Sequence, residues 1–223
     1  MSALTSPAHR EEPRLLGYPL WAWLGGAGPV VALAALVYAH LAAPEVSLLT
    51  DPISDYAHAP DTRAASLIGT LVLAMSLLWT VYGLAGVAPA HTAATRVLLI
   101  ICALGLVVTA IFTSDPAPGV TSSQGEIHRW SAAVVFTGIP VAGWMLARAP
   151  LAAALRRVLR GACLAAFLLL AVFLAVHPGS LVSELLTGHA YYALVQRVLV
   201  TVLVALASLL TAGCLALRRG GMS

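Results

Sequence analysis

The sequence predicts an all-α, polytopic six-helix transmembrane bundle, and two observations carry that prediction. Hydrophobic residues make up 60% of the 223 residues and charged residues only 9%, whereas a soluble domain carries roughly 25% charged residues. Six apolar segments, separated by short polar loops, reach or approach the length of about 20 residues that a bilayer-spanning helix needs. Because backbone groups inside lipid must be satisfied within the segment, we expect all six to be helices.

The six expected spans differ in how uniformly apolar they are. The first contains Pro29 among several glycines, which predicts a kink or a close contact with another helix. Pro140 likewise predicts a kink or a close helix contact in the fourth span. The fifth is the least uniform, because Arg160 lies near its start and must reach the membrane interface. The spans are expected at residues 15–42, 64–87, 95–113, 130–147, 158–176 and 190–217.

The distribution of arginine predicts the orientation, because positive residues are retained on the cytoplasmic side of a membrane. All twelve basic residues are arginines, and nine lie in the tails and in the loops after the second and fourth spans: Arg10, Arg14, Arg96, Arg148, Arg156, Arg157, Arg160, Arg218 and Arg219. We therefore expect a cell-membrane protein with cytoplasmic tails at residues 1–13 (disordered) and 218–223, around a membrane domain at residues 14–217. Arginines placed in this way set orientation, so the net charge of +3 predicts no nucleic-acid partner.

Polar residues gather in the loops that this orientation places outside the cytoplasm. Ser54 and Asp55 lie in the first of these loops, and Asp115 lies at the very end of the third span. His128 and Arg129 open the fourth span on the same side, so a carboxylate, an imidazole and a guanidinium are expected to meet there. Asp55, Asp115 and His128 are the predicted catalytic residues, because such groups transfer protons. Loops also collect these residues for turns and solvation, and that interpretation stays open.

Gln196 and Arg197 are the least expected polar residues of the sixth span. They lie about two turns past His189, which is roughly 12 Å at about 1.5 Å per residue. An arginine at that depth is costly unless it is paired, so Asp55 or Asp115 is its expected partner. The pair either clamps the bundle together or contacts a ligand. With Ser54, Gln196 and Arg197 are the predicted substrate-binding residues.

Four histidines on the same side suit a divalent metal such as zinc. His58, His128, His177 and His189 can supply three ligands and leave a fourth position for a water that the metal acidifies. Their spacing matches no helix-borne zinc motif. The three cysteines lie in apolar runs without a CxxC spacing, so we expect them to be packing residues.

Several of these residues carry a resemblance to a known family. The sequences Ile53-Ser54-Asp55, Ile111-Phe112-Thr113-Ser114-Asp115, Gly125-Glu126-Ile127-His128 and Gln196-Arg197 are similar to motifs of the DUF998 family of bacterial and archaeal six-span membrane proteins. The family usually has Pro where this chain has Thr113, and often Glu where it has Asp55. The resemblance implies a six-span fold and no particular activity. It marks Ser54, Asp55, Asp115, His128 and Arg197 as the positions of interest.

Three functions remain open from the sequence. The first is an enzyme that acts on a lipid or isoprenoid-like substrate at the outer leaflet. The second is a non-catalytic accessory or sensor protein that binds a lipid or a partner. The third is a small transporter, which the lack of acidic residues in the inner half of the bundle disfavours. Membrane lipids are partners in each case, and the oligomeric state stays open.

Overall fold

The computed structural model describes residues 19–115 and 121–220, and those residues form six long α-helices and two short 3₁₀ helices without a strand. The elements are α1 (Pro19–Ala42), η1 (Ile53–Ala57), α2 (Arg63–Val87), α3 (Ala93–Ile111), α4 (Ser123–Leu146), α5 (Ala153–Val176), η2 (Gly188–Ala190) and α6 (Tyr192–Gly220). The predicted tail at residues 1–13 lies outside the described part, as do residues 221–223. Arg218 and Arg219 form the last turn of α6, so the helix extends into the predicted second tail.

The predicted all-α fold is confirmed, and five of the six long helices have the length and composition of a membrane span. The exception is α4, although the sequence marked the fifth span as the least apolar. The physical reason is that α4 begins at Ser123, well before the predicted start at residue 130, and carries Glu126 and Arg129 in its first two turns. The chain is therefore a multi-pass membrane protein by its five apolar helices, with α4 as a more polar sixth helix.

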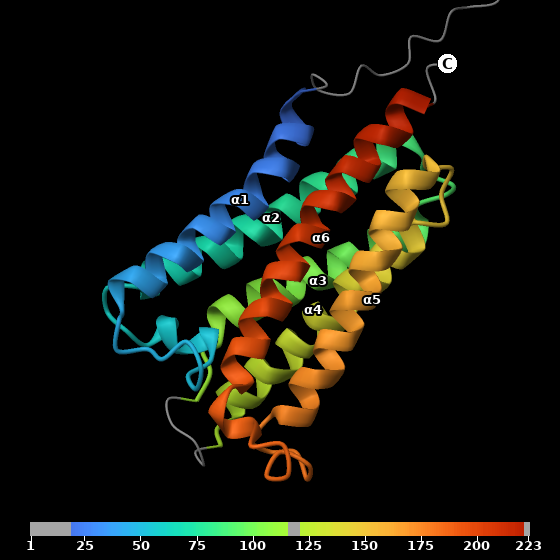
Figure 1. The fold of residues 1–223 in the computed structure, drawn as a ribbon. Helices are drawn as coiled ribbons and strands as arrows, with labels where there is room; N and C mark the ends of the chain where they lie inside the picture. Colours follow the sequence, from blue (N-terminus) through green and yellow to red (C-terminus); the bar gives the residue numbers. More distant parts are fainter. Residues whose placement is uncertain (1–18, 116–120, 221–223) are drawn as a thin grey trace, which may run out of the picture.

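Helix α6 runs through the middle of the bundle and joins its two sides (Figure 1). Helices α1 and α2 lie side by side, α3 pairs with α4, and α5 packs against α4 and α6. The loop residues 43–62, 112–115, 121–122 and 177–191 share one end of the bundle, which we call the η1 end. The start of α1 and the end of α6 share the opposite end, which we call the terminal end.

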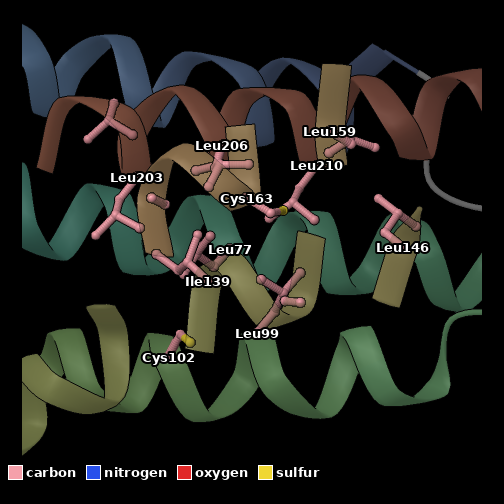
Figure 2. Close-up of a cluster of buried hydrophobic side chains, with 14 of the residues drawn as sticks. Leu77, Leu99, Cys102, Ile139, Leu146, Leu159, Cys163, Leu203, Leu206 and Leu210 are labelled. Carbon is pink, nitrogen blue, oxygen red and sulfur yellow. The ribbon is translucent and has the colours of Figure 1, made fainter. Parts of the chain in front are cut away.

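The core lies between α2, α3, α4, α5 and α6 (Figure 2). Its labelled members are fully or almost fully buried: Leu77, Leu99, Cys102, Ile139, Leu146, Leu159, Cys163, Leu203, Leu206 and Leu210. All three cysteines are buried and free, in agreement with a packing role. The core extends along most of the bundle, since Leu106, Phe173 and Leu199 belong to it in the η1 half.

Pro29 produces a close contact of α1 with its neighbours, as the sequence predicts. Proline has no backbone N–H, so the carbonyl of Gly25, four residues earlier, lacks its helical donor. The hydroxyl of Ser76 donates to that carbonyl at 2.6 Å, and the hydroxyl of Thr211 donates to it at 3.2 Å. A Cβ at Gly28 would clash with the Cβ of Ser76. Small residues and hydroxyls thus hold α1 tightly to α2 and α6 within the membrane domain.

Candidate functional site

A cavity of about 290 Å³ opens in the η1 half of the bundle, bounded by α1, η1, α2, α3, α4 and α6. Leu73, Ile139 and Leu203 line it and also belong to the buried core. Most of its wall is aliphatic. Its polar lining residues are Ser54, Arg63, Ser66, Thr70, Thr109, Thr113, His128, Gln196 and Thr201. Three predicted site residues are among them, and no aspartate or glutamate of the described residues lines the cavity.

His128 lines the cavity from the second turn of α4 and is half-buried. Its Nδ1 lies 2.8 Å from the carbonyl oxygen of Phe112. A carbonyl can only accept a hydrogen bond, so Nδ1 carries the hydrogen and donates it. In the neutral ring, Nε2 is then the unprotonated nitrogen and is left for a ligand or a proton.

Ser54 and Gln196 line the same cavity from η1 and α6. The Gln196 side-chain oxygen accepts a hydrogen bond from the backbone N–H of Ile53 at 2.9 Å. Gln196 therefore holds the start of η1 against α6. The Ser54 hydroxyl makes no hydrogen bond within the described part of the chain, so it is available to a ligand.

Arg197 holds the loop before η1 in place, although only 8% of it is exposed. Its Nη1 donates to the carbonyl oxygens of Leu48 at 3.1 Å and Asp51 at 2.7 Å. Its Nη2 donates to the Tyr56 hydroxyl at 3.2 Å, and the guanidinium carbon lies 5.5 Å from the centre of the Tyr56 ring. Arg197 is thus a structural clamp, one of the two roles that the sequence left open.

The expected partners of Arg197 are wrong. Among the described residues, neither Asp55 nor Asp115 lies within ion-pair distance of the guanidinium. The reason is geometric, because the loop at residues 43–52 folds over the start of α6 and presents backbone carbonyls first. The backbone N–H of Ala193 also donates to the carbonyl of Leu49 at 3.2 Å, which fixes the same approach.

Tyr56 is the residue that sequence reasoning missed. It is completely buried, and its hydroxyl lies 3.2 Å from Nδ1 of His40 in the last turn of α1. The Thr62 hydroxyl donates to the Tyr56 carbonyl oxygen at 2.6 Å, just before α2 begins. Tyr56 therefore connects α1, α2 and α6. The signal in the sequence was an aromatic residue in an otherwise polar loop, beside a helix that carries an unpaired arginine.

Asp115 holds the N-cap residue of α4, Ser122, in place. Its carboxylate accepts from the Ser122 hydroxyl at 2.6 Å and lies 3.3 Å from Nη1 of Arg129, so the expected meeting of Asp115 and Arg129 is confirmed. A Cβ at Gly125 would clash with the carboxylate, which shows how closely it approaches the helix. A negative charge is favourable at a helix N-terminus. His128 takes no part in this cluster, since its Nδ1 bonds elsewhere, and Asp115 does not line the cavity.

A comparison with known families finds one match. A family model described as "Protein of unknown function (DUF998)" matches residues 26–213. The chain belongs to the DUF998 family. The match runs from α1 into α6 and includes every residue that lines the cavity. Neither a curated protein nor a solved structure matches the chain.

The histidines of this DUF998 protein are not gathered into a metal site in the part that the structure describes. His58 lies 3.2 Å from the Ser114 hydroxyl, and His177 accepts a hydrogen bond from the backbone N–H of Gly179 at 3.1 Å. His189 lies in η2, and the position of its side chain is outside what the structure describes. Among the side chains described, no three His, Cys, Asp or Glu residues form a group that can hold a metal ion.

Asp55 lies in η1, half-buried and outside the wall of the cavity. Burial raises the pKa of its carboxyl from 3.8 to about 6, and the carboxylate of Asp51 adds to the rise. His58 and Arg197 act in the opposite direction without cancelling it. The raised pKa means that the folded DUF998 protein binds this proton more tightly than the unfolded chain does.

Asp55→Asn is expected to make stability less dependent on pH. As the pH rises from about 4 through 6, ionisation of Asp55 costs the wild-type protein stability, since the folded state gives up its proton last. The variant has no such cost. We expect it to gain on the order of 1 kcal/mol over the wild type at neutral pH, after discounting for solvent screening, and nothing near pH 4. Thermal unfolding in detergent across this range measures the difference.

Exposed Asp61 provides the matched control for that experiment, because Asp61→Asn removes the same charge from the same loop. A pH-independent difference between Asp55→Asn and the wild type would contradict the prediction.

Proposed function

We propose that the protein binds one lipid-like, single-chain amphiphile in the cavity, with the polar head at the η1 end. The cavity is the observation that carries the proposal. Its hydrogen-bonding groups Ser54, His128 and Gln196 come from the η1 end, whereas Leu73 and Leu203 form its aliphatic depth. Ligand pockets usually measure about 300–1,000 Å³. A cavity of about 290 Å³ is near the lower limit and suits one acyl or isoprenoid chain rather than two.

The orientation of the bundle in the membrane, as the arginines indicate it, would let the amphiphile enter the cavity from the extracytoplasmic leaflet. Arg63, Arg129 and Arg197 are the arginines of the η1 end. The described arginines of the terminal end are Arg96, Arg148, Arg156, Arg157, Arg160, Arg218 and Arg219. The positive-inside rule then favours a cytoplasmic terminal end. In this orientation α4 acts as the sixth span, with its polar first two turns at the outer interface of the cell membrane.

Native mass spectrometry of the purified protein with an oleoyl-chain amphiphile tests the proposal. We expect saturable binding of one molecule per chain, because the cavity has room for one chain. A broad series of adducts that never saturates would contradict it, since that behaviour is typical of lipids adhering to the outer faces of the helices.

A lipid-modifying enzyme is the second candidate, and His128 is the observation that favours it. Neither Asp55 nor Asp115 lines the cavity, so the role of general base falls to the Nε2 of His128. His128→Asn keeps an N–H near the place of Nδ1 and removes Nε2. We expect this variant still to bind the amphiphile. The rate at which it converts the amphiphile to a modified lipid, measured by mass spectrometry, is expected to fall by about 10²-fold or more. Unchanged product formation in His128→Asn, or none in the wild type, would exclude this candidate.

A further inference from the structure

Arg63 is the charged residue in the cavity wall, and its side chain is not engaged by the protein. It is the first residue of α2 and is exposed. Within the described residues its guanidinium makes no ion pair and no hydrogen bond. The two other arginines of the η1 end differ from it. Arg129 pairs with Asp115 and Glu126, and Arg197 donates to backbone carbonyls and Tyr56.

The surroundings of Arg63 favour a negative ligand. No acidic side chain among the described residues lines the cavity, so nothing in its wall neutralises the guanidinium. Ser54 and Ser66 also line it, and neither hydroxyl bonds to another described residue. The first turn of α2 contains no acidic residue either. The wall of the cavity therefore offers the guanidinium of Arg63 and the hydroxyls of Ser54 and Ser66 as hydrogen-bond donors, and no described residue accepts from them.

We propose that the amphiphile in the cavity carries an anionic headgroup, a phosphomonoester or a carboxylate, and that Arg63 binds it. This inference rests on the proposed function and names the class of its ligand, a single-chain anionic lipid from the surrounding leaflet. Guanidinium binds both headgroups through two parallel hydrogen bonds. An exposed guanidinium at the start of α2 meets the headgroup at the membrane interface, while the chain lies along the aliphatic wall. Ser54 and Ser66 donate to the remaining headgroup oxygens.

Three probes with the same oleoyl chain test the inference by competition binding: lysophosphatidic acid, lysophosphatidylcholine and monooleoylglycerol. Their headgroups are anionic, zwitterionic and neutral. The wild type is expected to prefer lysophosphatidic acid by about tenfold or more, which corresponds to about 1.4 kcal/mol. Arg63→Gln is expected to lose that preference and still bind monooleoylglycerol. Arg63→Lys keeps the charge without the two parallel bonds, so it retains part of the preference.

Arg157→Gln is the matched control, because Arg157 is also exposed but lies in the first turns of α5 at the terminal end. It is expected to keep the full preference. Equal affinity of the wild type for all three probes, or a preference that survives in Arg63→Gln, would overturn the assignment of an anionic headgroup and leave the cavity a binding site. Binding of none of the probes would overturn the proposed function itself. Bound monooleoylglycerol also shows that Arg63→Gln is folded.

Discussion

Ala132→Trp is expected to weaken binding of the amphiphile strongly without unfolding the protein. Ala132 lines the cavity from α4, and an indole at this position takes up much of the space of about 290 Å³. A chain that no longer fits must leave its aliphatic surface in lipid or detergent. We expect affinity to fall by about 100-fold or more, which is about 2.7 kcal/mol. Native mass spectrometry and competition with an oleoyl probe measure the loss.

Ala133→Trp is the matched control, since Ala133 is the next residue of α4, is exposed and does not line the cavity. It should bind the probe like the wild type. Val200→Phe fills the cavity from α6 and gives a second, independent test if Ala132→Trp proves unstable. Unchanged affinity in a folded Ala132→Trp or Val200→Phe protein would show that the amphiphile binds elsewhere.

Arg197→Met is expected to cost about 3 kcal/mol of stability and to release the loop before η1. Methionine preserves the aliphatic part of the side chain and removes every donor to Leu48, Asp51 and Tyr56. A hydrogen bond to a charged group contributes about 1.5–3 kcal/mol, and several lost together do not simply add. Thermal unfolding in detergent measures the loss, and limited proteolysis within residues 43–62 reports the released loop.

Arg197→Lys separates charge from geometry, because an ammonium keeps the charge but cannot span two carbonyls and the Tyr56 hydroxyl. It should fall between the wild type and Arg197→Met. Arg157→Met, at the terminal end, controls for the loss of one arginine. A stable Arg197→Met protein with a protease-resistant loop would mean that the loop is held by other contacts.

Five of the helices have the length and composition that lipid imposes on a span, so most of the helices of the fold could be predicted. The boundaries of α4 could not. Its polar first turns are stabilised by the N-cap Ser122, which Asp115 holds in place, and a hydropathy pattern does not reveal a cap. The effect of Pro29 could be predicted, because a proline leaves one backbone carbonyl without its helical donor in every helix. Here the hydroxyls of Ser76 and Thr211 donate to that carbonyl.

The candidate site could be predicted in part. The sequence placed its candidate residues at the η1 end, and three of them, Ser54, His128 and Gln196, line the cavity there. It indicated that Arg197 needs hydrogen-bonding partners but predicted carboxylates. Every residue has a backbone carbonyl, so the sequence cannot indicate which carbonyls accept from Arg197. The cavity itself could not be foreseen. It depends on the space left between α1, η1, α2, α3, α4 and α6, which only their packing determines.

The measurement that tests the central claim most directly is photo-crosslinking with a single-chain lipid phosphate that carries a diazirine at the end of its chain. If the cavity holds the chain with its head at the η1 end, peptide mapping will place the label near Ile139 and Leu203, and excess unlabelled lipid will remove it. Labelling confined to exposed faces such as Leu168 of α5, and insensitive to competitor, would contradict the account.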